Sequence, residues 1–255
     1  MLNASRLQAA ARRQLDDYDR HVPGSIFAEG AVGWDLDEAY QVQLAVVELR
    51  TSRGETVAGY KIGCVSEVIR KQLGIAHPVI GHIFEGEIVA SGSELNADHF
   101  DKPAIEGEFA VRIAADVPDA SSIAEHAARY VETIFPVIEL HNAAIRGQQS
   151  SAVELVSNNA LQAGIVVAVH ETQYQPLPAC QITVSINGAV QGSATTNPLE
   201  TLPELVERLA AVGLRLQKGQ IALTGSPLPL YPVAPGDAVL VEADGTASVR
   251  VLVRY

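Results

Sequence analysis

The segment Ala104-Ile105-Glu106-Gly107-Glu108-Phe109-Ala110-Val111-Arg112-Ile113 alternates in polarity with a period of two residues. This period predicts a β-strand, in which alternate side chains point to opposite faces. Glu106 and Glu108 therefore share one face. Two neighbouring carboxylates repel each other, so the arrangement is costly unless a cation or a shared proton compensates for it.

A third acidic residue stands in a similar setting. Glu139 lies in the short apolar run Phe135-Pro136-Val137-Ile138-Glu139-Leu140-His141, and a buried charge there needs a partner. Three carboxylates without Cys or His at zinc-site spacing suit a hard cation such as Mg²⁺ or Mn²⁺. We interpret Glu106, Glu108 and Glu139 as candidate metal ligands. The alternative is that all three lie on the solvated faces of surface strands.

His141 follows Glu139 by two residues, so a strand would place both on the same face. A histidine in this position could support a ligand without being one. We therefore consider His141 a candidate partner of Glu139.

The rest of the chain combines helical and strand patterns. Residues 7–15 and 36–47 carry apolar positions at helical spacing, with Asp35 or Asp37 as a possible cap for the second helix. Further helices are predicted from Ser122 to Tyr130, opened by a capping box, and from Leu202 to Leu214. Short runs rich in β-branched residues predict strands at 104–114, 137–140, 164–169, 181–186, 220–223 and 238–242.

This order of elements predicts a mixed α+β fold. Residues 1–55 form a helical N-terminal cap, and residues 56–255 form the β-rich catalytic region. The sequence shows neither an internal repeat nor a low-complexity linker. We therefore expect the cap and the β-rich region to be one structural unit.

Composition narrows the range of functions. The 255 residues are 47% hydrophobic, enough for a large core, and 30 acidic against 18 basic residues give a net charge of -12. No Lys or Arg run could follow a phosphate backbone, which argues against nucleic acid as a partner. Neither a secretory signal nor a membrane span is evident, so we expect no membrane partner. The two distant cysteines, Cys64 and Cys180, predict a reduced, cytoplasmic setting.

Several short motifs occur together in one order and span most of residues 35–253. They are Tyr60-Lys61-Ile62-Gly63, Gln72-Leu73-Gly74, Glu106-x-Glu108, Glu139, Asn159-Ala160 and Leu223-Thr224-Gly225-Ser226. As a set they resemble the fumarylacetoacetate hydrolase superfamily. Within it, the chain looks most like the 2-keto-4-pentenoate (2-hydroxypenta-2,4-dienoate) hydratase and 4-oxalocrotonate decarboxylase branch of aromatic catabolism.

The resemblance implies a mixed β-roll flanked by helices, and a homo-oligomer. It also implies that Glu106, Glu108 and Glu139 hold Mg²⁺ or Mn²⁺. The implied activity is that of a metal-dependent hydro-lyase on a small 2-hydroxy-2,4-dienoate or 2-oxo acid. The alternatives are a 4-oxalocrotonate-type decarboxylase, an acylpyruvate C–C hydrolase and a non-catalytic partner subunit.

The resemblance also assigns residues to the substrate. Lys61 would lie beside it as a catalytic group that moves or stabilises a proton, although a lysine can also extend from a strand end to water. Thr224 and Ser226 would offer hydroxyl groups to an anionic substrate, and Asn159 and His82 are further candidate substrate-binding residues.

Two segments depart from the pattern expected of the hydratases. The expected acidic residues are absent from Ile75-Ala76-His77-Pro78-Val79-Ile80-Gly81, and an expected Asp before Asn159 is replaced by Asn158. An amide cannot accept and return a proton as a carboxylate can. These changes leave the metal ligands intact but bear on whether the reaction is a hydration.

Overall fold

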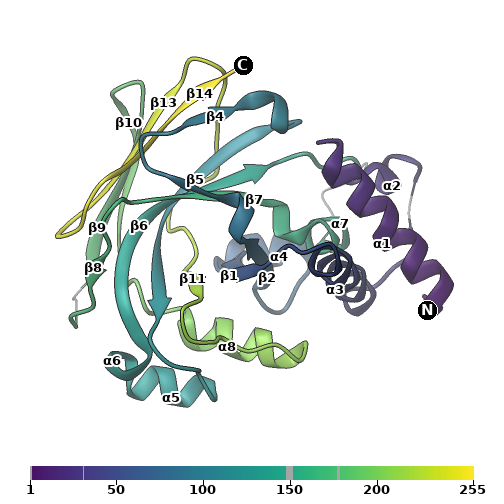
Figure 1. Ribbon diagram of the computed structural model, residues 1–255, viewed down its shortest axis with the longest axis horizontal. Helices are drawn as coiled ribbons and strands as arrows, with labels where there is room; N and C mark the ends of the chain where they lie inside the picture. Colours follow the sequence, from purple (N-terminus) through teal and green to yellow (C-terminus); the bar gives the residue numbers. More distant parts are fainter. Residues whose placement is uncertain (1, 31, 148–151, 177–178) are drawn as a thin grey trace.

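The computed structural model describes residues 2–30, 32–147, 152–176 and 179–255. Within these residues two β-sheets pack together, with helices beside the larger sheet (Figure 1). The predicted mixed α+β class is confirmed. No helix in these ranges combines the length and the apolar character needed to span a bilayer.

The larger sheet curls around its two long central strands, β5 (Pro103–Ile113) and β6 (Val131–Asn142). Its order is β2-β1-β11-β5-β6-β7-β3, with β12 added to β5 and β8 added to β6. The other strands are β1 (Val57–Gly63), β2 (Val79–Phe84), β3 (Ile88–Ala90), β7 (Gln162–Val167), β8 (Thr172–Gln173), β11 (Ile221–Leu223) and β12 (Tyr231–Pro232).

The smaller sheet has the order β10-β9-β13-β14-β4 and covers one face of the larger sheet. Its strands are β4 (Glu94–Asn96), β9 (Cys180–Ile186), β10 (Ala189–Thr196), β13 (Ala238–Ala243) and β14 (Val249–Arg254). Phe109 and Ile138 of the larger sheet share the main core with Val184 and Val241 of the smaller sheet. This burial of two apolar faces against each other stabilises the layered arrangement.

Gly107 explains how closely the two sheets approach. A Cβ atom at this position would lie 2.5 Å from Val184 Cγ2 and 3.1 Å from Val241 Cγ2, both in the smaller sheet. Residue 107 therefore faces the smaller sheet. Because side chains alternate along a strand, Glu106 and Glu108 face the opposite side, as the sequence predicts.

Three N-terminal helices and one from the middle of the chain lie to one side of the larger sheet (Figure 1): α1 (Ala4–Asp19), α2 (Ser25–Ala28), α3 (Leu36–Ser52) and α7 (Ala152–Ser157). Asp35 caps α3 and forms a capping box with Glu38. The division of the chain at residue 55 stays a prediction.

The remaining helical elements lie between strands: α4 (Glu67–Leu73), α5 (Ala120–Glu125), α6 (Ala127–Tyr130), α8 (Leu202–Ala211), η1 (Glu85–Glu87), η2 (Ala97–His99) and η3 (Asn159–Leu161). The predicted helix from Ser122 to Tyr130 was wrong in its start and its continuity. Asp119 caps α5 by accepting a hydrogen bond from Ser122 N at 2.7 Å, and the helix is interrupted at His126.

Candidate functional site

The acidic residues of β5 and β6 meet on the face turned away from the smaller sheet. In the antiparallel register Glu106 lies directly opposite Glu139, and Ala104 lies opposite His141. Opposite residues on one face of a sheet are close enough to interact. The pairing of the two strands therefore brings Glu106, Glu139 and His141 together.

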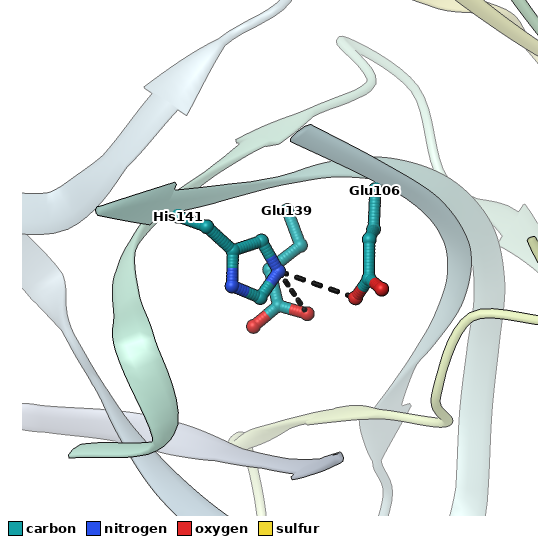
Figure 2. Close-up of side chains that lie close together, drawn as sticks. All are labelled: Glu106, Glu139 and His141. Atoms are coloured by element: carbon teal, nitrogen blue, oxygen red, sulfur yellow. Dashed lines mark ion pairs between the residues drawn. The ribbon is translucent and has the colours of Figure 1, made fainter. Parts of the chain in front are cut away.

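One oxygen or nitrogen atom from each of these three side chains lies within 4.8 Å of the others, as a shared metal ion would require. His141 Nε2 is 3.2 Å from Glu106 Oε2 and 3.2 Å from Glu139 Oε2 (Figure 2). Glu139 and His141 are buried, whereas Glu106 is partly exposed. The surface-strand alternative therefore fails for Glu139, and the predicted pairing of His141 with Glu139 is confirmed.

Lys61 reaches this cluster from β1. Its Nζ lies 3.1 Å from Glu139 Oε1, and its side chain is only 4% exposed, so it does not extend to water. A Cβ atom at Gly63 would lie 3.2 Å from Lys61 Nζ, and one at Gly81 would lie 3.3 Å from Lys61 Cε. The two glycines thus leave room for the lysine side chain. Its ammonium group balances one of the carboxylates.

Glu108 is fully buried beside the same cluster. Its Oε2 accepts a hydrogen bond from Gly225 N, while Oε1 has no hydrogen-bond partner among the described residues. Burial and the negative charge of Glu139 raise the pKa of Glu108 well above its usual value. The structure therefore places all three predicted carboxylates at one site, although the tight group contains His141 and not Glu108.

The charges around Glu139 favour its ionised form. Burial opposes ionisation, but His141 and Lys61 outweigh it and lower the pKa of Glu139. Burial likewise opposes the charged form of Lys61, yet the surrounding carboxylates, Glu139 above all, raise its pKa. Against burial, Glu139 is the main group that raises the pKa of His141 to about 9. The site thus holds charged groups out of water through mutual pairing.

The donor set fits a divalent cation. Glu106, Glu108 and Glu139 bring three carboxyl groups together, and burial and their mutual repulsion raise the pKa of Glu108. A divalent cation would relieve this repulsion. Glu108 Oε1 is buried without a hydrogen-bond partner in the described ranges. Carboxylate oxygens are the ligands that Mg²⁺ and Mn²⁺ prefer.

The loop after β11 is hydrogen-bonded to the backbone of β5. Thr224 Oγ1 donates a hydrogen bond to Phe109 O at 3.0 Å, and Ser226 Oγ donates one to Gly107 O at 3.0 Å. These bonds hold Gly225 N against Glu108. The predicted contact of Thr224 and Ser226 with substrate stays a prediction, and in this arrangement both hydroxyl groups position the loop.

Asn159 connects η3 to the edge strand β2. Its side-chain amide accepts from His82 N at 2.7 Å and donates to His82 O at 2.8 Å, as a neighbouring strand would. Asn159, Ala160 and Leu161 all have positive φ, a conformation that costs energy in residues other than glycine. Both of these side-chain hydrogen bonds of Asn159 are made to the backbone of His82 in β2. The predicted role of Asn159 in substrate binding stays a prediction.

His82 faces away from the acidic cluster. Lys61 lies opposite Gly81 in the register of β1 and β2, whereas His82 lies opposite Tyr60. Because neighbouring residues of a strand alternate between faces, His82 points to the side opposite Lys61. Its ring packs edge-on against Tyr60 at 5.2 Å between centroids. This placement favours a structural role over the predicted substrate contact.

His82 should make the protein sensitive to acid. Burial lowers the ring pKa to about 4, against 6.5 for an unperturbed histidine, so the unfolded chain binds more protons between these values. The contribution of neutral His82 to folding stability is therefore complete above pH 6.5. It is lost as the pH falls toward 4, by about 3 kcal/mol at most. We expect chemical denaturation to show a smaller acid loss in His82→Phe. The control is His77→Phe at an exposed position, and an unchanged pH dependence in His82→Phe would contradict this assignment.

The two departures from the hydratase pattern have contacts outside the carboxylate cluster, although Gly81 at the end of the first segment adjoins Lys61. Asn158 Oδ1 accepts a hydrogen bond from Gln14 Nε2 of α1 at 2.8 Å. Ile75 and Val79 belong to a small apolar cluster with Ala39 of α3. The Asn158 side chain therefore binds helix α1. This contact argues against the idea that the change from Asp to Asn at position 158 removes a proton carrier from the site.

The sequence pointed to the Thr224-Gly225-Ser226 turn as a source of N–H donors for a substrate anion, but not to the bond between Gly225 N and Glu108. The backbone N–H of Gly225, rather than a side chain, contacts Glu108. The only sequence signal was the Thr224-Gly225-Ser226 turn itself, since glycine allows the positive φ of 82° found there.

Comparison with known proteins gives consistent results. Residues 76–254 match the family model described as fumarylacetoacetate (FAA) hydrolase C-terminal. A 2-hydroxyhexa-2,4-dienoate hydratase from Comamonas testosteroni is 27% identical over 226 residues, covering 84% of this chain and 86% of that protein. A 2-keto-4-pentenoate hydratase from Paraburkholderia phymatum is 25% identical and covers 98% of both chains.

Among solved structures, a 4-oxalocrotonate decarboxylase from Pseudomonas putida G7, complexed with magnesium and adipate, has a TM-score of 0.90. It is 21% identical and covers 99% of both chains. At this identity the likeness establishes the shared fold. It confirms the β-roll architecture that the sequence motifs predict.

Proposed function

This chain belongs to the fumarylacetoacetate hydrolase family, and from that membership we propose that it is a divalent-metal-dependent hydratase of small 2-hydroxy-2,4-dienoates or 2-oxo acids. The observation that carries the proposal is the buried site in which Lys61 contacts Glu139 next to Glu106 and His141. Curated relatives named as hydratases of such substrates support it.

The proposed ligands of the ion are Glu106, Glu108 and Glu139, with His141 beside them as a partner or a further ligand. When bound, Mg²⁺ or Mn²⁺ would supply a Lewis acid that stabilises negative charge on the carboxylate and 2-oxygen of the substrate. The Mg²⁺ in the structurally similar decarboxylase supports this choice of ion.

Lys61 is the proposed proton-handling group. Hydration of a dienol requires a proton to reach carbon as the enol becomes a ketone, followed by addition of water across the remaining conjugated bond. Lys61 Nζ is held at 3.1 Å from Glu139 Oε1, so its proton has a fixed position at the site. The buried setting keeps solvent from competing for that proton.

Decarboxylation is the second candidate reaction. It is favoured by the coverage of 99% of both chains in the match to 4-oxalocrotonate decarboxylase. Hydrolysis of an acylpyruvate and a non-catalytic partner role remain weaker alternatives. An assay with 2-hydroxypenta-2,4-dienoate, 4-oxalocrotonate and an acylpyruvate, each with Mg²⁺, separates the reactions by product mass. Gain of water supports the proposal, loss of carbon dioxide replaces it with the second candidate, and no consumption supports the non-catalytic role.

We also propose a cytoplasmic homo-oligomer. Cys64 and Cys180 lie far apart in the sequence, a pattern that suits a reducing compartment. Light scattering of the purified protein tests the assembly.

Metal should stabilise the folded protein. An ion that binds only the folded state raises its stability by mass action, by about 2.7 kcal/mol at a concentration 100 times its Kd. We expect millimolar Mg²⁺ or Mn²⁺ to raise the Tm and a chelator to lower it, as measured by differential scanning fluorimetry. A Tm that does not respond to either ion would count against the site.

A further inference from the structure

We propose that His141 is itself a ligand of the divalent ion, through Nε2, and that it shifts the preference of the site from Mg²⁺ toward transition-metal ions. This inference rests on the metal site of the proposed function and adds a nitrogen atom to its carboxylate ligands. Three features support it: the position of Nε2 between two carboxylates, its lack of a hydrogen-bond partner, and an irregularity of β6 at this residue.

The Nε2 atom of His141 lies between one oxygen of each neighbouring carboxylate. It is 3.2 Å from Glu106 Oε2 and 3.2 Å from Glu139 Oε2 (Figure 2). Two ligand atoms that bind one ion at right angles, with bonds of about 2.1 Å, are about 3.0 Å apart. The two separations at His141 are therefore close to those between adjacent ligands of a single ion.

The same nitrogen atom makes no directed hydrogen bond. Nε2 is buried and has no hydrogen-bond partner among the described residues, although both carboxylate oxygens lie 3.2 Å away. Neither oxygen therefore lies where a ring N–H would point. A buried polar atom in this state is costly, and an ion bound to Nε2 and to both carboxylates would satisfy all three groups.

The burial of Nε2 is compatible with an ion. A metal bonded at about 2.1 Å approaches a nitrogen atom more closely than a water molecule hydrogen-bonded at about 2.9 Å. The ion would lie among the ligand atoms themselves and needs no water-sized space beside the ring. Glu106, whose side chain is 23% exposed, connects this group of atoms to solvent.

The backbone of β6 changes its pairing at this residue. The register of β6 with β7 shifts between Leu140 and His141, whereas the register with β5 continues there without a break. A shift of this kind, as in a β-bulge, re-aims a side chain, and such bulges are frequent beside active sites. The residue opposite His141 on β5 is Ala104, whose small side chain leaves room for the ring.

Lys61 and His141 contact different oxygens of Glu139. Lys61 Nζ lies 3.1 Å from Oε1, whereas His141 Nε2 lies beside Oε2. The ammonium group therefore leaves Oε2 available to an ion. Metal-bound histidine is neutral, so the imidazole would give up any proton on Nε2 to solvent as the ion replaces that proton beside the two carboxylates.

An imidazole ligand changes which ions the site prefers. Carboxylate oxygens suit Mg²⁺, whereas imidazole nitrogen suits Zn²⁺, Fe²⁺ and Ni²⁺. Because transition-metal ions bind many kinds of site tightly, a high affinity for Ni²⁺ alone does not identify the ligand. The informative quantity is the ratio of the Ni²⁺ affinity to the Mg²⁺ affinity, and its change when the imidazole is removed.

Calorimetric titration of wild type and His141→Gln with Ni²⁺ and with Mg²⁺ tests the assignment. Glutamine keeps a polar group of similar reach but replaces the ring nitrogen by an amide. We expect the ratio of Ni²⁺ to Mg²⁺ affinity to fall at least about tenfold. Loss of a residue that only orients the carboxylates would weaken both ions alike, and loss of a competing positive charge would strengthen both. Either result, with an unchanged ratio, would overturn the proposal.

His99→Gln is the matched control, because His99 is exposed and its ring stacks on that of His21 at 4.8 Å between centroids. Such a surface pair can bind Ni²⁺ by itself, so this variant identifies that contribution. The ion at the acidic cluster is recognised by its weaker binding in Glu139→Gln. Absence of any such ion in wild type would overturn the proposed metal site together with this inference, whereas normal Mg²⁺ binding with an unchanged ratio would overturn only the role of His141.

A spectroscopic measurement on the wild-type protein does not depend on the folding of a variant. With ¹⁵N-labelled histidine and one equivalent of ¹¹³Cd²⁺, a direct metal–nitrogen bond gives a scalar coupling between the ion and Nε2. We expect this coupling at His141, assigned through its connection to the backbone resonances. A Cd²⁺ ion bound at the acidic cluster without coupling to His141 would show that the imidazole is a neighbour of the ion, and would overturn the proposal.

Discussion

Replacing Glu139 by glutamine is expected to lower turnover of a 2-hydroxydienoate at least ~10²-fold and to weaken Mg²⁺ binding. Glu139 is 1% exposed and contacts both Lys61 and His141, so its charge is central to the site. Glutamine keeps the size of the side chain but removes the negative charge. A loss of this size is typical when a group that stabilises transition-state charge is misplaced or removed.

Glutamine substitutions at Glu106 and Glu108 distinguish metal ligands from residues that only lie beside the ion. Glu106→Gln should weaken Mg²⁺ binding because Glu106 belongs to the group that a single ion could bridge. If Glu108 is the third ligand, as we propose, Glu108→Gln should weaken it as well. If Glu108 instead stays protonated beside Glu139, glutamine would mimic it and leave the affinity unchanged.

Calorimetric titration with Mg²⁺, together with turnover at saturating ion, measures both effects. Glu94→Gln is the control, because Glu94 lies in β4 and is 63% exposed beside Arg254. A change at such a surface residue should alter stability by no more than about 0.5 kcal/mol. Wild-type Mg²⁺ affinity in any one of the three ligand variants would remove that residue from the proposed set.

The sequence predicted the elements whose signals are local. The period of two in 104–113 and the capping residue Asp35 each belong to a few consecutive residues, and β5 and α3 follow them closely. The predicted strand at 137–140 was too short, because β6 extends from Val131 to Asn142. Proline cannot donate to a sheet. Pro136 fits within β6 because the pairing of β6 with β7 ends at Val137 and β8 pairs at Ile134, so among the described residues no strand pairs with Pro136 on that side.

The site residues were predictable where the spacing of residues along one strand fixes which face they share. Glu106 and Glu108 share a face in any strand, and so do Glu139 and His141. The position of His82 depends on the register between β1 and β2, which brings Lys61 opposite Gly81. A shift of one residue would have turned His82 toward the cluster. The contact of Gly225 N with Glu108 is between residues 117 positions apart, and no local pattern reports it.

Lys61→Met is expected to reduce turnover by ~10²-fold or more while leaving Mg²⁺ bound. The proposed role of Lys61 concerns a proton of the substrate, and loss of a positioned acid or base typically costs 10²–10⁴-fold. Methionine retains much of the apolar stem but cannot carry a charge. Because the variant loses the ammonium group 3.1 Å from Glu139 Oε1, the site becomes more negative. Mg²⁺ affinity should then stay the same or rise, and this combination distinguishes a proton carrier from a residue that only maintains the ligand geometry.

Turnover is measured at saturating Mg²⁺, where the ion offsets the added repulsion among the carboxylates, and calorimetry gives the ion affinity. Lys71→Met is the matched control, because Lys71 is 74% exposed on α4 and pairs with Glu67 there. Incorporation of deuterium from D₂O into the carbon skeleton of 2-oxopent-4-enoate provides a second readout. We expect enzyme-catalysed exchange to fall in step with turnover in Lys61→Met and to stay at the wild-type rate in Lys71→Met. Wild-type turnover and exchange in Lys61→Met would exclude the lysine from proton transfer, whereas a parallel loss of Mg²⁺ affinity would assign it to the ligand geometry instead.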